Sequence, residues 1–389
     1  MLCLLLYLCL VCINLFYVCC SSETITLYYF DFNRGRFTQF YFGEPAKPVL
    51  GIMSLSSQYT ILTKKSYKRE LSQTFKMTSV NKTMSSVYDI FRINKGKDDS
   101  SFPLLSFYCL NNEAQPNDVD VFGFSYKFDL PSFSIIHQLY DKGFIKELGF
   151  GLSPIYDEDQ GDLYLGKLPS YVRDNKEKLV CDVNTNYNEW NCKLRYIYIE
   201  NDKYKGYHLN NVGIFVSDRR EIVVGKHLWD FVVDNIFKKY YFGNNTCEYD
   251  NKTDTTYQRI KCECIHILYI PKIYIIIGKS ELIFKAWDLF QSSGRYSCDF
   301  QIIYDSQIDS NSILLGTSFY SSYFIYFNYR LNQIEMLSYQ KILPTELDDS
   351  FLNQTEIVDY KFIYVMILII TLSIMSLLLL YCKLQKPFH

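Results

Sequence analysis

The chain has 389 residues, enough for about two domains of ordinary size. Its formal net charge of −2 provides no basic field to attract nucleic acid, so we expect no nucleic-acid partner. Aromatic residues make up 17% of the chain and tyrosine alone occurs 35 times, which favours β-strands over helices and disorder.

The chain begins with an uncharged apolar segment. Residues 2–20 read LCLLLYLCLVCINLFYVCC and run into Ser21-Ser22, which predicts a secretory signal peptide over residues 1–21. No Lys or Arg precedes this apolar run, and it is nearly long enough to span a bilayer, so an uncleaved anchor is the alternative.

Short runs rich in β-branched and aromatic residues dominate the body of the chain, separated by clusters of Asn, Gly, Pro and Asp. They predict strands at 25–32, 39–43, 193–200, 265–278 and 323–331. Apolar residues three and four positions apart predict short surface helices at 132–143 and 226–241. Polar stretches predict long loops at 94–101 and 244–257.

A second apolar run lies near the C-terminus. Residues 362–382 contain no charge and are long enough to cross about 30 Å of hydrocarbon, which predicts a transmembrane helix. Lysines flank this run and two of them lie in the tail 383–389, which favours a cytosolic tail. We therefore expect a single-pass type I membrane protein of the secretory pathway, with its body in the lumen or outside the cell. Four Asn-x-Ser/Thr motifs in that body predict glycosylation at Asn81, Asn244, Asn251 and Asn353.

The cysteines agree with an oxidising compartment. Of the 13 cysteines, five lie in the N-terminal apolar segment, one lies at the end of the second apolar run, and seven lie in the body. Because seven is odd, one is free or pairs between chains. In an extended strand, Cys262, Cys264 and His266 would share a face as soft metal ligands. No fourth ligand is evident, so we expect disulfides here, with no metal and no other cofactor.

The stretch 313–328, ILLGTSFYSSYFIYFN, resembles the C-terminal signature of the pepsin-like aspartic peptidases, although Asn328 stands where the family has Asp. Upstream of this stretch, five further motifs stand in the family's order. They are VFGFSY (121–126), IIHQLYDKGFI (135–145), FGLSP (150–154), GDLYLGKL (161–168) and PKIYIIIGKSELIFKAWDLF (271–290). Together these motifs span nearly all of the body. The resemblance implies an all-β, bilobal acid-protease fold with a few short helices, followed by the transmembrane helix.

The resemblance also implies the domain limits and one disulfide. It implies an N-terminal lobe at 22–185, a C-terminal lobe at 186–345 and a juxtamembrane stalk at 346–361. It implies a disulfide between Cys262 and Cys298 in the C-terminal lobe.

The family's chemistry uses one Asp-Thr/Ser-Gly loop from each lobe. Two neighbouring carboxyl groups cannot both ionise, so they share a proton and act on a water as base and acid in turn. The glycine permits the tight turn, and the Thr or Ser ties the loops together by hydrogen bonds. Counting from Gly43 puts Ser54-Leu55-Ser56 at the first triplet, and the spacing to Ile222 and Gly225 puts Val216-Ser217-Asp218 at the second.

Neither triplet carries the family's acid. Val216 has no titratable group, and the hydroxyl of Ser54 can hold a water but cannot take its proton. Shifting the second triplet by two residues makes Asp218 the fallback acid. Arg219 would then hold that carboxylate ionised, and the N-terminal lobe would still lack an acid.

The charged run Asp218-Arg219-Arg220-Glu221 has two interpretations. The simpler one is a solvated hairpin tip, where charge is ordinary. In the other, Arg219 and Arg220 face the cleft and bind a carboxylate through their guanidinium groups.

The sequence therefore favours a membrane-anchored pseudoprotease that binds a peptide or protein partner in the cleft between its lobes. A divergent but active aspartic endopeptidase and a glycosylated surface scaffold are the alternatives. An ordered cleft lined with apolar side chains would favour binding over scaffolding, and two acids within hydrogen-bond reach across the lobes would favour activity.

Overall fold

The computed structural model describes the following residues: 24–32, 35–80, 83–93, 103–111, 119–155, 160–175, 177–200, 206–209, 211–238, 246–249, 256–278, 280–309 and 312–338. Both apolar segments, the stalk, the tail and the four candidate glycosylation sites lie outside these residues. None of the helices formed by the described residues is both long and apolar enough to cross a membrane.

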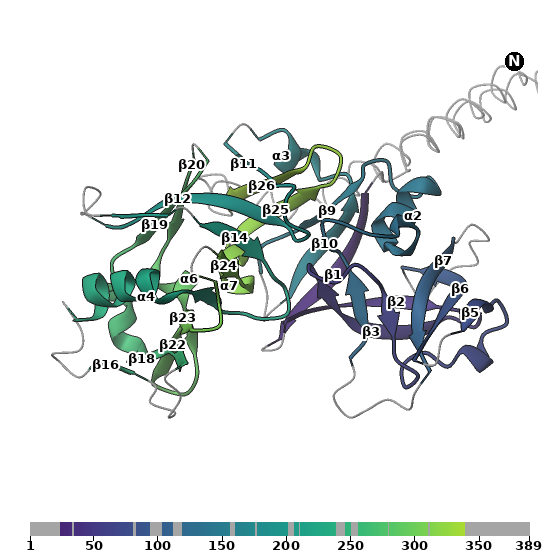
Figure 1. Cartoon of the computed structure of the whole chain (residues 1–389), viewed down its shortest axis with the longest axis horizontal. Coiled ribbons are helices and arrows are strands. Elements are labelled where there is room, and N and C mark those ends of the chain that lie inside the picture. The colour runs from purple at the N-terminus through teal and green to yellow at the C-terminus, as the bar shows by residue number, and fades with distance from the viewer. Residues whose placement is uncertain are drawn as a thin grey trace, which may run out of the picture. The chain divides into compact units, whose positions relative to one another are not determined.

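The larger sheet of the described chain has thirteen strands (Figure 1). Their order is β11-β26-β25-β9-β10-β1-β2-β3-β8-β4-β7-β6-β5. The strands are β1 (Thr24–Phe32), β2 (Gly35–Phe42), β3 (Lys47–Ser54), β4 (Ile61–Leu62), β5 (Lys76–Val80), β6 (Met84–Arg92), β7 (Leu104–Leu110), β8 (Val121–Gly123), β9 (Gly149–Leu152), β10 (Gln160–Gly166), β11 (Leu179–Asp182), β25 (Tyr323–Asn328) and β26 (Gln333–Ser338).

The C-terminal half of the described chain forms two smaller sheets. The first contains β12 (Asn191–Ile199), β13 (Tyr207–His208), β14 (Val212–Phe215), β15 (Ile222–Val224), β17 (Tyr257–Gln258), β19 (Ile273–Ile277), β20 (Ser280–Phe284), β23 (Ile302–Asp305) and β24 (Ser312–Leu315). The second contains β16 (Cys247–Tyr249), β18 (Ile260–Glu263), β21 (Phe290–Ser292) and β22 (Ser297–Phe300).

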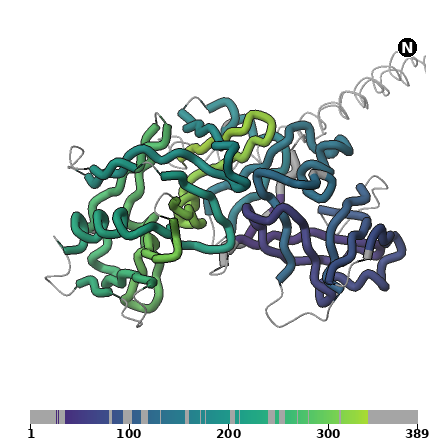
Figure 2. The backbone as a smooth tube through the Cα atoms, in the orientation of Figure 1, coloured from purple at the N-terminus to yellow at the C-terminus, as the bar shows by residue number. Residues whose placement is uncertain are grey.

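The end of the described chain returns to the larger sheet. Strand β25 pairs with β9 and β26, and β26 pairs with β11. Figure 2 shows this yellow-green segment running back beside the blue strands of the first half. The rings of Phe327 on β25 and Phe150 on β9 stack with centroids 4.7 Å apart. The expected C-terminal lobe at 186–345 therefore contributes two strands to the sheet of the first half.

Short helices connect the strands. They are η1 (Arg69–Leu71), η2 (Pro131–Phe133), α2 (Ile135–Asp141), α3 (Ser170–Arg173), α4 (Lys226–Val232), which continues as η4 (Val233–Phe237), η6 (Cys264–Tyr269), α6 (Ala286–Leu289) and α7 (Thr317–Tyr320). The two helices expected from apolar spacing are present as α2 and as α4 with η4.

The strand expected at 265–278 is wrong in its first half, which forms η6. The chain leaves the sheet at Cys264, whose N–H donates to the carbonyl of Tyr296. It re-enters a sheet only at Ile273, two residues after Pro271, which has no N–H for a ladder. The loop expected at 244–257 contains β16 and the first residue of β17.

The seven cysteines among the described residues form three disulfides, Cys181–Cys192, Cys247–Cys262 and Cys264–Cys298, and leave Cys109 free and buried. Burial raises the pKa of the Cys109 thiol to about 12, so this thiol stays protonated at neutral pH.

The expected bond between Cys262 and Cys298 is therefore wrong. Strand β18 lies between β16 and β22, so Cys262 stands opposite Cys247 on one side and opposite Cys298 on the other. Its single sulfur bonds to Cys247, and Cys264, just beyond the end of β18, bonds to Cys298. With both sulfurs in disulfides, the alternative metal site at Cys262 and Cys264 has no thiolate to offer, and the described residues contain no metal-binding cluster.

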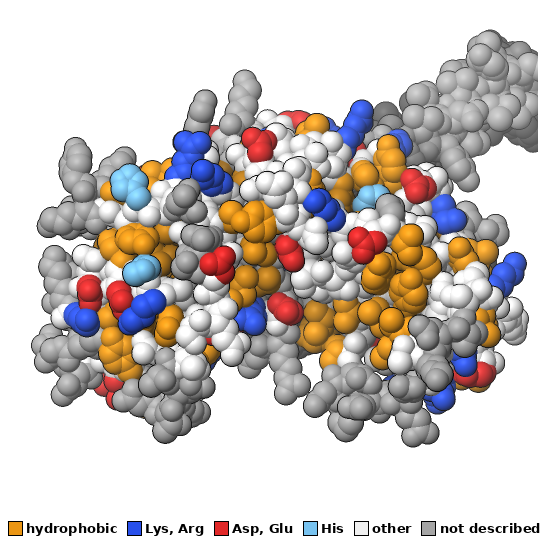
Figure 3. Space-filling model, in the orientation of Figure 1, with side chains coloured by type: hydrophobic (Ala, Val, Ile, Leu, Met, Phe, Trp, Pro, Cys, Tyr) orange, Lys and Arg blue, Asp and Glu red, His pale blue; other side chains and the backbone are white. Residues whose placement is uncertain are grey.

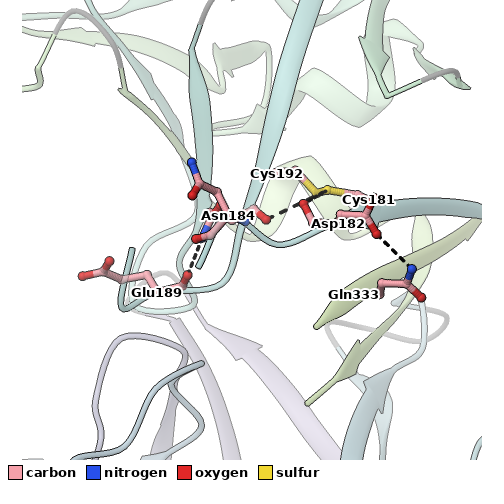
Figure 4. Close-up of a disulfide and its surroundings, with 7 residues drawn as sticks. Cys181, Asp182, Asn184, Glu189, Cys192 and Gln333 are labelled. Atoms are coloured by element: carbon pink, nitrogen blue, oxygen red, sulfur yellow. Dashed lines mark hydrogen bonds between the residues drawn. A yellow bond between two sulfur atoms is a disulfide. The ribbon is translucent and has the colours of Figure 1, made fainter. Parts of the chain in front are cut away.

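The Cys181–Cys192 disulfide links two sheets (Figure 4). Cys181 on β11 belongs to the larger sheet, and Cys192 on β12 belongs to the first sheet of the C-terminal half. Beside this bond, Gln333 Nε2 of β26 donates a hydrogen bond of 2.9 Å to Asp182 Oδ1 of β11. The disulfide thus links β11 in the larger sheet to the start of β12 in the next sheet.

Candidate functional site

Two loops from different sheets meet at the side chain of Ser217. Its Oγ accepts a hydrogen bond of 3.0 Å from the backbone N–H of Leu55 and donates one to the carbonyl of Met53. Ser217 is buried, so neither partner group has water to replace this hydroxyl. One side chain therefore ties the loop after β14 to the loop after β3, as the resemblance implies for the Ser of the second triplet. We call this contact between the two loops the loop crossing.

The loop after β3 is held by its own side chains and by the end of β8. Ser54 Oγ accepts from the N–H of Ser57 at 3.0 Å and lies 3.2 Å from Ser56 Oγ. The Ser54 carbonyl accepts from the N–H of Phe124 at 2.8 Å. A Cβ on Gly123 would lie 2.8 Å from the Ser57 carbonyl oxygen, so glycine is needed for β8 to approach the loop this closely. Ser54 is consequently buried, with its hydroxyl turned to its own loop.

The loop after β14 is held by other parts of its sheet. The N–H of Val216 donates to the carbonyl of Leu315 at 3.1 Å, and the Val216 carbonyl accepts from the hydroxyl of Tyr320 at 2.8 Å. The Val216 side chain is 8% exposed and has no polar atom. The backbone of Val216 is thus fixed precisely while its side chain offers no acid–base chemistry.

The charged run 218–221 lies between β14 and β15, but these strands do not form a hairpin. Strand β24 lies between them, parallel to β14 and antiparallel to β15. The predicted hairpin tip is therefore wrong.

The backbone of the charged run instead caps α7. The carbonyls of Arg219 and Arg220 each accept a hydrogen bond of 3.0 Å, from the N–H groups of Thr317 and Ser318. These are N–H groups of the first helical turn, which have no partner within a helix. A Cβ on Gly316 would lie 2.1 Å from the Glu221 carbonyl oxygen, so only glycine allows this approach.

The side chains of the charged run differ in their surroundings. Asp218 is exposed, whereas Arg219 and Arg220 are half-buried. Glu221 Oε1 forms an ion pair of 2.5 Å with Arg259 Nη2. Burial raises the pKa of Tyr257 on β17, and the positive charge of Arg259 acts against that rise. An anion site at Arg219 and Arg220 stays a prediction.

Sequence reasoning missed Arg36, which is fully buried behind the loop after β14. The backbone N–H of Arg36 donates to the Ser217 carbonyl at 3.1 Å. Its guanidinium carbon lies 4.5 Å from the ring centroids of both Tyr29 and Tyr320. Cation–π contacts of this kind stabilise a desolvated guanidinium. Arginine side chains are mostly exposed, so the sequence predicts a surface position for Arg36 and gives no signal of its burial.

Two buried acids of the first half, Asp120 and Asp89, serve other bonds. Asp120, just before β8, is buried, and its Oδ1 accepts from the N–H of Thr63 and from Ser66 Oγ, both at 2.6 Å. Asp89 accepts the hydroxyl hydrogen of Tyr67, which is also buried. The loop crossing thus brings together hydroxyl groups and backbone amides.

Comparison with known proteins supports the architecture. No protein-family model matches the sequence, and no curated protein does. Among solved structures, the aspartic proteinase from Irpex lacteus matches with a TM-score of 0.62, covering 81% of this chain and 97% of that chain. The chain has the pepsin-like fold. The predicted bilobal β architecture is therefore confirmed, and at 12% sequence identity the likeness to this proteinase concerns the fold alone.

Proposed function

We propose that this pepsin-like chain is a membrane-anchored, catalytically inactive protein that binds a peptide or protein partner in the cleft between its lobes. The observation that carries the proposal is the loop crossing at Ser217, where one hydroxyl bonds the backbone of the opposite loop. In the alignment of motifs, Ser54 and Val216 flank this crossing at the two positions where the family has its acids.

Peptide hydrolysis by an acid pair needs a base that takes a proton from water and an acid that returns one. Val216 supplies neither, and the Ser54 hydroxyl already accepts from the N–H of Ser57. Asp218 is the one carboxyl among the six residues of the two triplets, and a lone carboxylate cannot share a proton with a partner. These residues favour a site without hydrolytic activity.

The residues that bind a peptide in such a cleft are mostly different from the acids that cleave it. Substrate affinity in a peptidase comes from contacts along the bound peptide, whereas the acids act only at the reacting bond. The loop crossing and both lobes persist here without the acids, so retained peptide binding is the function that this architecture serves best. The apolar segment 362–382 is the proposed anchor, which places the lobes on the lumenal or extracellular side.

Peptide capture tests this proposal. The full chain, purified in detergent, is incubated from pH 3 to 7 with a diverse library of extended peptides that fluoresce on cleavage. We expect peptides to be retained intact and to be displaced by a statine-type transition-state analogue. Ser56→Arg, which puts a bulky charge at the exposed edge of the loop crossing, should reduce retention. The matched control Ser293→Arg, in the turn after β21, should leave retention unchanged.

Two results would overturn parts of the proposal. Folded protein that retains no peptide at any pH would exclude cleft binding and favour the surface-scaffold alternative. Cleavage that the statine compound inhibits and Asp218→Ala abolishes would exclude inactivity and make Asp218 the catalytic acid.

A further inference from the structure

Four apolar side chains of the C-terminal half are unusually exposed. Single apolar side chains at a protein surface are ordinary, and Figure 3 shows several on the face drawn there. Tyr269, Ile265, Tyr296 and Trp287 are different, with exposed fractions of 78%, 72%, 70% and 57%. Among the other large apolar residues whose exposure the structure describes, Leu331 alone reaches the same range, at 57%.

These four residues stand on neighbouring elements. Ile265 and Tyr269 lie on η6, Trp287 lies on α6, and Tyr296 lies in the turn between β21 and β22. Helix η6 contacts both α6 and β22, and the N–H of Cys264 donates to the Tyr296 carbonyl at 2.9 Å. We call this group the aromatic surface.

The aromatic surface is built on fixed supports. The Cys264–Cys298 disulfide joins the start of η6 to β22. In α6, Ala286 and Leu289 are buried, and the carboxylate of Asp288 accepts from Lys285 N–H at 2.8 Å and from Ser322 Oγ at 2.6 Å. Because α6 is anchored by the residues on its other side, the outward position of Trp287 contributes little to the core.

Basic groups accompany the exposed rings. Lys285 Nζ lies 5.1 Å from the centroid of the Trp287 ring, and Arg295 Cζ lies 5.3 Å from that of Tyr296. Trp and Tyr combine an apolar ring with a polar edge, and Lys and Arg carry a charge on a flexible apolar stem. This combination is characteristic of the headgroup region of a bilayer, where rings enter the boundary and cations meet phosphates.

We propose that the aromatic surface contacts the bilayer in which the same chain is anchored, with Trp287 and the neighbouring rings in the headgroup region. The inference rests on the proposed anchor at 362–382. Strand β26 ends at Ser338, and residues 339–361 reach at most about 80 Å when fully extended. Such a tether keeps the lobe near the membrane and raises the local concentration of lipid, so contacts too weak for a free protein suffice to orient the lobe.

Tryptophan fluorescence tests this contact directly. The chain has three tryptophans, and Trp190 and Trp229 are buried, so Trp287 is the one that lipid can reach. The full chain is reconstituted in phosphatidylcholine vesicles with and without a lipid that carries a nitroxide quencher near its headgroup. We expect the quencher to remove a clear fraction of the emission from the wild-type chain and almost none from Trp287→Phe.

A second variant checks that the surface acts as a unit. Tyr269→Ser with Tyr296→Ser leaves Trp287 in place and should at least halve its quenching. A wild-type chain that floats with the vesicles but shows the same quenching as Trp287→Phe would overturn the inference and leave the aromatic surface to a protein partner. A chain that does not float with the vesicles would instead contradict the proposed anchor, so the two failures are distinguishable.

Discussion

The loop after β3 and the loop after β14 meet at one point but are held there in different ways. The first is fixed by its own residues, through the bond between Ser57 N–H and Ser54 Oγ, and by the end of β8, through the bond between Phe124 N–H and the Ser54 carbonyl. The second is fixed by the rest of its sheet, through Tyr320 and through α7. The tie between the loops is also one-sided. Ser217 reaches across with a hydroxyl, whereas Leu55, at the matching position of the other loop, is packed into the core.

The difference shows that the geometry of the crossing does not depend on acids. Every bond described for it uses backbone groups or hydroxyls, so the crossing needs no carboxyl group at either triplet for its support. A carboxyl group there would contribute acid–base chemistry. Architecture and catalysis are therefore separable in this fold, and substitutions can test each support on its own.

The largest effect should come from Gly316→Ala, which attacks the support of the second loop. The new Cβ would lie 2.1 Å from the Glu221 carbonyl oxygen and 2.6 Å from that of Arg220, so the backbone has to move. We expect a loss of about 3 kcal/mol in the free energy of unfolding, measured by denaturant titration. Gly294→Ala is the matched control. Its Cβ meets nothing closer than 4.0 Å, and it should change stability by less than about 0.5 kcal/mol. Equal stability of the two variants would contradict the capping role of the charged run.

Ser217→Ala should have the next largest effect, because it removes the tie between the loops. The N–H of Leu55 and the carbonyl of Met53 would lose this partner in a buried place, at a cost of about 2 kcal/mol. The control is Ser56→Ala in the first loop, where the hydroxyl is exposed to water and its loss should cost less than about 0.5 kcal/mol. Denaturant titration compares the two, and a Ser217→Ala variant as stable as Ser56→Ala would show that the crossing does not depend on this hydroxyl.

The smallest effect should be a pH dependence of the stability that comes from Asp120, a buried acid beside β3. Burial raises the pKa of Asp120, whose carbonyl accepts from the N–H of Ile52 on β3 at 2.8 Å. The folded chain therefore keeps this proton to higher pH than the unfolded chain does. The resulting stabilisation is present below the ordinary pKa of about 3.9 and is lost as the pH rises through the raised value.

Asp120→Asn isolates this contribution, because it keeps an oxygen acceptor for Thr63 and Ser66 but cannot ionise. We expect the melting temperature of the wild type to fall relative to that of the variant as the pH rises from about 3 to 6. A difference that stays constant over this range would mean that Asp120 titrates alike in the folded and unfolded chains.

The sequence predicted the fold better than it predicted the site. Alternating aromatic and β-branched residues correctly indicated β1 and β25, and apolar spacing indicated α2 and α4. The same apolar, β-branched pattern misled at 265–269, where the disulfide at Cys264 and the exit from the sheet produce η6. Local pattern decides an element only where tertiary contacts agree with it.

Long-range contacts explain what the sequence could not show at the site. The assignment of the two triplets depended only on spacing, from Gly43 for the first and to Ile222 and Gly225 for the second. The capping of α7 uses the carbonyls of Arg219 and Arg220, and a carbonyl has no signature in the residue type. The correct disulfide partner of Cys298 also depends on sheet order, because two cysteines two residues apart compete for the same neighbours.

The most direct test of the account places a carboxyl group at the first position of each triplet. Initial rates of cleavage of the quenched peptide library from pH 3 to 7 are compared for the wild-type chain, Ser54→Asp, and the double variant Ser54→Asp with Val216→Asp. The account predicts no cleavage by the wild type or the single variant and statine-sensitive cleavage by the folded double variant, because only that variant has a carboxyl on each side of the Ser217 tie. Statine-sensitive cleavage by the wild type, at a rate that the added acids do not increase, would contradict it.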